Sequence, residues 1–228
     1  MGTRGLIGYI LRNKQRKAAY NHWDSYPQGQ GHWIAQFIAG LSPEQCEEMA
    51  NRIRRLRQAT QWVESEDEGA PVPEDVKKRY LADGGIWQHN FPHGGPQNWF
   101  DEFDFKGLSE DEKQSLIEKK KRKAAELLMN DDFDDPLEDL DWDAVLKGVQ
   151  GAKALQLIQQ GRLSHLVDYT GFLQGFDCEW AYFIDFNNQK MEIWAGDYFI
   201  GEVTFSTLRD DKNYMKKRNW SDDEDEDY

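Results

Sequence analysis

The sequence predicts an α+β protein in which about five antiparallel strands form one sheet and helices pack on one face of that sheet. Strand-like patterns stand near both ends of the chain, at residues 6–23 and 178–205, and helix-like patterns stand between them. Joining an N-terminal hairpin to a C-terminal meander leaves few exposed sheet edges, so we expect both to belong to the same sheet.

The N-terminal hairpin is predicted by two strand patterns, 6–11 and 17–23, on either side of a polar loop of hairpin length. In the second strand, the period of two puts Tyr20 and His22 on one face. Pro27 and the glycines that follow it then end the regular structure. The chain is therefore expected to turn from sheet to helix just after this hairpin.

Helices are predicted after this turn by apolar residues that recur at helical spacing. The sequence Ser42-Pro43-Glu44-Gln45 has the pattern of a capping box, with Pro at the first helical position, and begins a second helix. A later stripe over 145–158 ends at Gly161, which we expect to be a left-handed C-cap. The first helix is expected to bury one stripe made of Trp33, Ile34, Phe37, Ile38 and Leu41.

The clearest strand pattern lies near the C-terminus. Residues 178–186 alternate between two faces, and Cys178 and Trp180 share one of them. A polar turn leads into a strand at 191–194, and a third strand is expected at 199–205. These three strands predict an antiparallel meander.

The chain of 228 residues is long enough for one core, since a domain of this size buries about 70% of the surface that its unfolded chain exposes. We expect a single α+β domain over residues 1–208, interrupted by a charged insertion at 65–140. Residues 209–228 are expected to form an acidic, disordered tail, because their last part is almost entirely Asp and Glu.

Charge is distributed unevenly along this acidic chain, whose net charge is -14. Residues 1–23 carry five bases and no acid, whereas the insertion and the tail are rich in Asp and Glu. A negatively charged protein repels phosphate backbones, so we do not expect nucleic acid as a partner except through the basic N-terminal hairpin. The acidic regions favour a basic protein partner instead.

Cysteine usage and hydropathy predict the compartment. Cys46 and Cys178 fall on a predicted helix face and a predicted strand face, which is typical of buried free thiols and favours a reducing compartment. No run of about 18 apolar residues could span a bilayer, and no apolar signal segment stands at the N-terminus. We therefore expect a soluble protein of the cytoplasm or nucleus, with no membrane partner and no cofactor.

Three motifs in the same order carry a resemblance to a known family. They are Thr3-Arg4-Gly5, the segment Asn-His-Trp-Asp-Ser-Tyr-Pro at 21–27 and the segment Cys-Glu-Trp-Ala-Tyr-Phe-Ile-Asp at 178–185. The chain resembles a family of uncharacterised intracellular proteins that is abundant in filamentous fungi and has phage and bacterial relatives. The resemblance covers roughly residues 1–62 and 142–208. It implies no activity and does not extend to the acidic stretch between those ranges.

Four residues are candidates for catalysis. Histidine as a residue type titrates near neutrality, so His22 could act as a base with Asp24 orienting its ring; alternatively, Asp24 caps the turn and His22 satisfies a backbone carbonyl. Cys178 could be a nucleophile if the fold pairs it with His22, or it could pack in the core. Thr3 could act as an N-terminal nucleophile after removal of the residues before it, or its hydroxyl could satisfy the end of the first strand.

Polar and aromatic side chains crowd the end of the hairpin and the start of the meander. The guanidinium of Arg4 has the charge to hold an anion, and the aromatic rings offer apolar surface with polar tips. We expect a ligand-binding site that uses Arg4, Tyr20, Asn21, Trp23, Tyr26, Glu179 and Trp180.

Two patterns in the insertion do not qualify as metal sites. His89 and His93 are four residues apart, but Pro92 between them forbids the helix that a zinc pair of this spacing needs. The acids at 131–139 lack the spacing of an EF-hand loop. Within them, residues 134–138 fit Asp-Asp-x-x-Glu and so resemble the tRNA-dependent arginine cyclodipeptide synthases of fungi; the alternative is a solvated acidic linker.

These observations favour two functions of different classes. The first is a ligand-binding or protein-interaction module, in which acidic regions recruit a basic protein partner or the hairpin end holds a small molecule. The second is an amide-directed hydrolase or transferase, with Arg4 holding an anion, His22 as base, Asp24 as orienter and Cys178 or Thr3 as nucleophile. A tRNA-dependent cyclodipeptide synthase is a further alternative.

Overall fold

The computed structural model describes residues 2–59, 62–82, 109, 115, 140–146, 149–217 and 220. These residues belong to two compact units, of which the first joins Met1–Glu68 to Val149–Tyr228 and the second spans Gly69–Gly148. The second unit contains helices α3 (Glu74–Ala82) and α5 (Trp142–Leu146). The insertion predicted at 65–140 thus overlaps the second unit, and the patterns of its histidines and acids lie outside the described residues.

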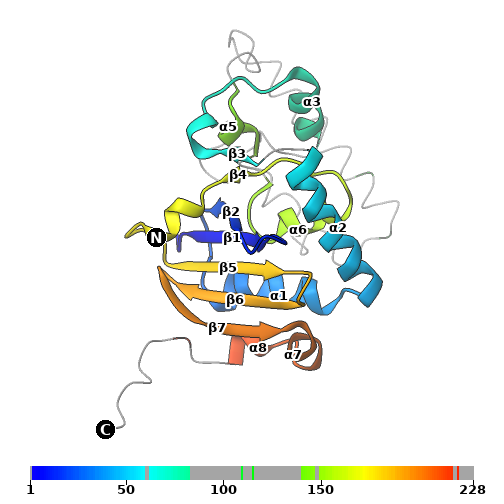
Figure 1. Ribbon diagram of the computed structural model, residues 1–228, viewed down its shortest axis with the longest axis vertical. Coiled ribbons are helices and arrows are strands. Elements are labelled where there is room, and N and C mark those ends of the chain that lie inside the picture. The colour runs from blue at the N-terminus through cyan, green and yellow to red at the C-terminus, as the bar shows by residue number, and fades with distance from the viewer. Residues whose placement is uncertain are drawn as a thin grey trace. The chain divides into compact units, whose positions relative to one another are not determined.

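The first unit is built on one five-stranded sheet with the strand order β2-β1-β5-β6-β7 (Figure 1). The predicted union of the N-terminal hairpin with the C-terminal meander is therefore confirmed. The sheet contains four pairs of neighbouring strands, and three of these pairs are antiparallel. The strands are β1 (Gly5–Ile10), β2 (Arg16–Asn21), β5 (Trp180–Asp185), β6 (Lys190–Ala195) and β7 (Tyr198–Thr204).

The pairing of β1 with β5 is parallel, so the sheet is mixed and the prediction of a purely antiparallel sheet was wrong at this pair. Parallel neighbours need a long connection, because both strands must start at the same end of the sheet. Here the chain leaves the hairpin after Asn21 and returns at Trp180 only after passing through the helices. Local sequence patterns carry no information about that direction.

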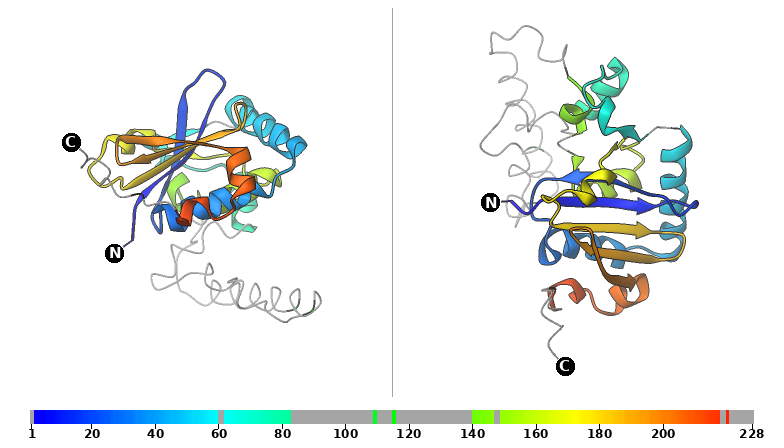
Figure 2. Two further views of the ribbon diagram at one scale, coloured as in Figure 1. Left: turned by 90° about the horizontal axis from the view of Figure 1, so that it is seen from below. Right: turned by 60° about the vertical axis from the view of Figure 1, so that its left-hand side comes forward.

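One face of the sheet is covered by helices α1 (His32–Ala39), α7 (Phe205–Asp210) and α8 (Tyr214–Lys217), which lie together below the strands in the left view of Figure 2. The turn η1 (Pro27–Gly31) leads into α1. A Cβ on Gly31 would lie 2.8 Å from Tyr182 Oη and 3.0 Å from Met215 Cε. Glycine here lets strand, turn and α8 approach closely.

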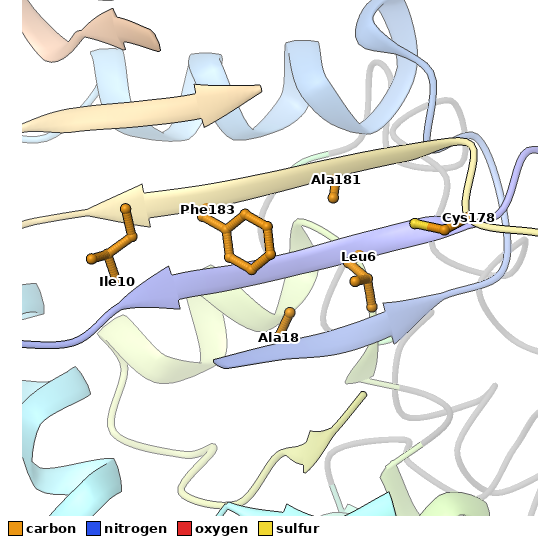
Figure 3. Packing of buried hydrophobic residues seen from close by; sticks show 6 residues of the cluster. All are labelled: Leu6, Ile10, Ala18, Cys178, Ala181 and Phe183. Carbon is orange, nitrogen blue, oxygen red and sulfur yellow. The ribbon is translucent and has the colours of Figure 1, made fainter. Parts of the chain in front are cut away.

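The other face carries a hydrophobic cluster that no α-helix of the described residues covers. A 3-10 helix, η6 (Thr170–Gln174), contacts β1 and β2, and Tyr169, Phe172 and Leu173 pack against the cluster. Figure 3 shows six buried members of this cluster, which are Leu6, Ile10, Ala18, Cys178, Ala181 and Phe183. Cys178 is therefore a core residue at the start of β5.

The capping box predicted for helix α2 (Pro43–Ala59) is confirmed. The backbone N of Ser42 donates to Gln45 Oε1 at 2.8 Å, and the backbone N of Gln45 donates to Ser42 Oγ at 3.2 Å. In α1, by contrast, Trp33 is 52% exposed although Ile34 and Ile38 are buried. The buried stripe of α1 is narrower than predicted, because Trp33 lies about 100° around the helix from Ile34.

The helix expected over 145–158 is interrupted. Helix α5 ends at Leu146, and α6 (Lys153–Gln159) begins after Gly151, whose φ of +71° does not belong to a right-handed helix. The φ of Gly161 is also +71°, as expected for a left-handed C-cap. Part of the expected tail is ordered, since α8 lies within 209–228 and Trp220 is buried; residues 221–228 lie outside the described residues.

A second small sheet, which the sequence did not predict, anchors the edge of the main one. Strand β3 (Val63–Glu64) pairs in parallel with β4 (Val167–Asp168). Lys17 on β2 makes ion pairs with Asp168 and, at 2.8 Å, with Glu64. Burial acts to raise the pKa of Asp168, but its hydrogen bonds to Lys17 and Thr170 prevail and lower it. This buried ion pair joins β2 to β4.

We predict that Gly5→Ala destabilises the protein strongly. A Cβ on Gly5 would lie 2.2 Å from the backbone O of Trp180 and 2.7 Å from Ser25 Cβ, so the β1–β5 pair or the turn at Ser25 must shift. Denaturant unfolding should show a loss of about 3 kcal/mol, as expected for overpacking at a rigid contact. Gly171→Ala is the control, since a Cβ there meets nothing within 4 Å. Equal unfolding midpoints for the two variants would contradict this prediction.

Candidate functional site

One row of paired residues crosses the whole sheet at the end where β1 and β5 begin. Gly5 pairs with Asn21 on one side and with Trp180 on the other. Trp180 pairs with Ala195, which in turn pairs with Tyr198. The loops that leave all five strands at this end, on the left in Figure 1, therefore lie side by side.

These loops and strand ends expose five large apolar side chains, which we call the aromatic rim. Four strand spacings of about 4.8 Å separate β2 from β7, so the rim extends over about 19 Å. Apart from it, the only exposed large hydrophobic side chain among the residues whose exposure the structure describes is Trp33. The rim consists of Trp23 (53% exposed), Tyr26 (39%), Phe176 (fully exposed), Tyr198 (66%) and Phe199 (44%).

Carboxylates stand between the rings of the rim. Asp24, Glu179 and Asp197 are exposed, and Asp177 makes an exposed ion pair of 3.1 Å with Arg4. The backbone N of Arg4 also donates to Glu179 Oε1 at 3.1 Å. Four acids against one arginine give this end of the sheet a negative charge, which attracts cationic groups.

The loop that carries Trp23 and Tyr26 is held by buried hydrogen bonds. Asn21 Nδ2 donates to the backbone O of Trp23 and, at 2.7 Å, to Ser25 Oγ. Tyr182 Oη donates to the backbone O of Ser25 at 2.8 Å. Because these partners lie on β2 and β5, the loop is fixed to the sheet and its two rings are presented from a defined backbone.

His22 and Asp24 occupy different settings in this loop. His22 is exposed, with Nδ1 at 2.8 Å from Tyr20 Oη and its ring edge-on to Trp23 at a centroid distance of 4.4 Å. Asp24 has a φ of +55°, and its backbone O accepts a hydrogen bond from the N of Gln30 at 2.7 Å. This placement of Asp24 agrees with the turn-forming alternative considered above.

The thiol of Cys178 and the ring of His22 lie in different surroundings, because Cys178 belongs to the buried cluster and His22 is exposed beside Tyr20 and Trp23. Cys178 is 4% exposed, and its Sγ donates to the backbone O of Trp180 at 3.8 Å. Burial, and then the negative charge of Glu179, raise the pKa of this thiol to about 12. The thiolate is the nucleophilic form of cysteine, so this environment favours packing over catalysis.

Thr3 lies just before β1 and is half-buried. Its backbone O accepts a hydrogen bond from the N of Ser25 at 3.1 Å. A Cβ on Gly2, the preceding residue, would lie 2.3 Å from Trp23 Cε3, so the chain there runs close against that ring. The contacts of this segment hold the loop of the rim to the start of β1.

The predicted ligand-binding residues divide into two groups. Arg4, Trp23, Tyr26 and Glu179 are exposed at the rim. Tyr20 packs against Phe172 and Tyr169, with centroid distances of 5.2 and 5.8 Å, and Asn21 is 4% exposed. Trp180 is half-buried in the row of paired residues. Tyr20 and Asn21 thus support the loop of the rim and add no exposed side chain to it.

Sequence reasoning missed the half of the rim that comes from the meander. It consists of Phe176 before β5 and of Tyr198 and Phe199 after the turn between β6 and β7, with Asp177 and Asp197 beside them. Both segments combine glycine, aspartate and an aromatic residue, as Gly-Phe-Asp and Gly-Asp-Tyr-Phe. Glycine and aspartate favour turns at the surface, so an aromatic residue beside them is near the end of a strand, and this pattern could have indicated exposure.

Comparison of the chain with protein families, curated proteins and solved structures found no match. Within the described part of the chain, no group of three or more His, Cys, Asp or Glu side chains could hold a metal ion. The helices described here include none that is long and apolar enough to cross a membrane. The chemical character of the rim is therefore the principal guide to function.

We predict that Cys178 is unreactive in the folded protein. In Cys46→Ala, which leaves Cys178 as the sole thiol, a thiol-reactive reporter should react about a thousandfold more slowly than with the unfolded chain at pH 8, because the raised pKa leaves little thiolate. Denaturant should abolish the difference. Rapid reaction in the native state, with an apparent pKa near neutrality, would contradict this prediction.

His32 supplies a prediction of pH dependence. It is 7% exposed at the start of α1, its Nδ1 has no hydrogen-bond partner, and burial and then the charge of Lys216 lower its pKa. Below a pH of about 6.5, which is the pKa of histidine in an unfolded chain, the unfolded chain binds a proton at His32 more readily than the folded chain does. The free energy of unfolding therefore falls as pH falls. Unfolding of His32→Phe should depend less on pH between about 7 and 5. An unchanged slope would contradict this assignment.

Proposed function

We propose that this protein is a protein-interaction module that binds a positively charged segment of a partner protein through its aromatic rim. The observation that carries the proposal is the gathering of five exposed rings and four exposed carboxylates in adjacent loops at one end of the sheet. Exposed apolar surface of this extent, with charged groups between its rings, is typical of interaction sites.

Arginine and lysine are the side chains that this surface suits best. A cation over the face of an exposed Trp, Tyr or Phe ring gains about 0.5–1 kcal/mol. A guanidinium can also make two parallel hydrogen bonds to one carboxylate. Rings and carboxylates alternate along the rim, as in Trp23-Asp24 and Asp197-Tyr198, so one cationic side chain can contact both kinds of group.

The spread of the rim favours a polypeptide over a small molecule. Small-molecule sites are concave and enclose most of the ligand. The rim instead consists of loop tips and strand ends distributed over about 19 Å, a span that an extended peptide of about six residues matches. Two buried free cysteines favour a reducing compartment, and we therefore place the interaction in the cytoplasm or nucleus.

A titration with synthetic peptides tests this proposal. An arginine-rich peptide should bind, whereas its citrulline counterpart, which keeps the shape and loses the charge, should bind much more weakly. Trp23→Ala and Tyr198→Ala should each weaken binding by about fivefold, through loss of the cation–ring contact. Asp24→Asn and Asp197→Asn should weaken binding most at low salt, where charge is least screened. Calorimetry at two salt concentrations measures both effects.

Matched controls separate the rim from the overall charge of the protein. Glu47→Gln on α2 and Asp210→Asn on α7 remove the same charge from exposed positions outside the rim. These variants should bind the peptide like the wild type. If they weaken binding as much as the rim variants, the peptide responds only to net charge and the proposal fails.

A further inference from the structure

The two edges of the main sheet differ in how they are covered. At β2, the backbone N of Tyr169 donates to the O of Ala18 at 2.8 Å, and the N of Ala18 donates to Thr170 Oγ1 at 3.1 Å. At the other edge, no strand within the described ranges pairs with the outer side of β7. That strand is the longest of the sheet, with seven residues.

Backbone amides of β7 point away from the sheet. Phe205 N donates to Gln189 O at 2.9 Å, so these two residues form a hydrogen-bonded pair. The next pair along the ladder is Lys190 with Thr204. Since bonded and non-bonded pairs alternate along an antiparallel ladder, Val203 N faces β6, whereas the N–H groups of Glu202 and Thr204 face outward. An open edge of this kind is a template for a further strand.

The exposed side chains of β7 include aromatic rings and a carboxylate, as do the loops at the rim. Tyr198 and Phe199 belong to it, and farther along the strand the exposed carboxylate of Glu202 makes an ion pair of 2.6 Å with Lys190 on β6. Phe199 pairs with Trp194, and Glu202 pairs with Glu192, two residues earlier on β6. The register shifts between Ile193 and Trp194, which leaves one extra residue in β7. Phe199 and Glu202 therefore stand on the same face of the sheet although they are three residues apart, and that face presents an aromatic ring and then a carboxylate along the open edge.

We propose that the partner chain, where it continues beyond the positively charged segment that crosses the rim, turns along the outer edge of β7 and pairs with it as a sixth strand. This inference rests on the proposed function and adds how the segment is held. Main-chain hydrogen bonds to β7 supply affinity, and alternate side chains of the added strand meet Phe199 and Glu202. The segment recognised would thus be extended and carry arginine or lysine at every second position.

Charge favours this occupant over a second copy of the chain. Pairing two copies through β7 would bring the exposed Asp197 and Glu202 of each copy to one interface. Each copy also has a net charge of -14, so repulsion opposes the approach. A cationic strand meets the opposite situation, because Asp197 and the net negative charge of the protein attract it, and Glu202 can exchange Lys190 for the incoming cation.

Amide hydrogen exchange with a defined peptide tests the pairing. The probe is a peptide that alternates arginine with threonine, added at saturating concentration to the full chain and followed by NMR. Exchange at the Glu202 amide should slow by about tenfold or more, since a new hydrogen bond protects it. The amide of Val203 faces β6 and serves as the internal control. Unchanged exchange at Glu202 with the peptide bound would overturn the proposal.

Backbone methylation of the peptide distinguishes failure of this inference from failure of the proposed function. A version methylated at the amides that would face β7 should bind about fivefold more weakly for each hydrogen bond lost. Equal binding of both versions, with dependence on Trp23 retained, would overturn strand addition and leave the rim as the binding site. Absence of binding by either version would overturn both.

Two variants and a mass measurement complete the test. Glu202→Gln removes the carboxylate alone, and Glu202→Pro also removes an outward N–H without removing a bond to β6. Relative to Glu202→Gln, Glu202→Pro should therefore weaken the unmethylated peptide by about a further fivefold and bind the methylated one equally. Sedimentation of the free protein should show a monomer, and hydrogen exchange should show that its Glu202 amide is unprotected. A dimer in which that amide is already protected would mean that a second copy occupies the edge, and would overturn the proposal.

Discussion

The parallel pairing of β1 with β5 is the contact on which the rest of this structure depends. It joins the N-terminal hairpin to the C-terminal meander, so that one sheet forms from the two ends of the chain. It also places the backbone of Arg4 beside that of Glu179, whose N donates to Arg4 O at 3.0 Å. Without this pair, the loops of the aromatic rim would belong to two separate hairpins.

The architecture behind the rim explains how exposed rings can be held in place for binding. Ser25 lies against Gly5, and its backbone O accepts the hydrogen bond from Tyr182, a fully buried residue of β5. The loop is thus tied to the strand at the middle of the sheet. A binding surface whose backbone is fixed in advance loses less conformational entropy on association, so more of its contact energy appears as affinity.

Ionisable groups in the first unit divide by location. Two acid–base pairs lie beneath the surface: Lys17 with Asp168, and Arg16 with Glu192, whose carboxylate it contacts through two hydrogen bonds of 2.8 Å. The buried thiol of Cys178 has a raised pKa. Catalytic sites typically gather perturbed groups in one cleft. Here the internal charges support the sheet, and the rim offers exposed charges that suit binding.

The sequence by itself determined the elements whose signals are local. Strand alternation predicted the hairpin and the meander, and the Ser42–Gln45 box and Gly161 predicted helix ends, because each pattern depends on neighbours within a few residues. It also indicated Trp23, Tyr26, Arg4 and Glu179 as site residues. Only the tertiary structure decided the parallel direction of β1 and β5, the exposure of Trp33, and the joining of Phe176, Tyr198 and Phe199 to the rim. Those features depend on contacts between residues far apart in the chain, and no local period records such contacts.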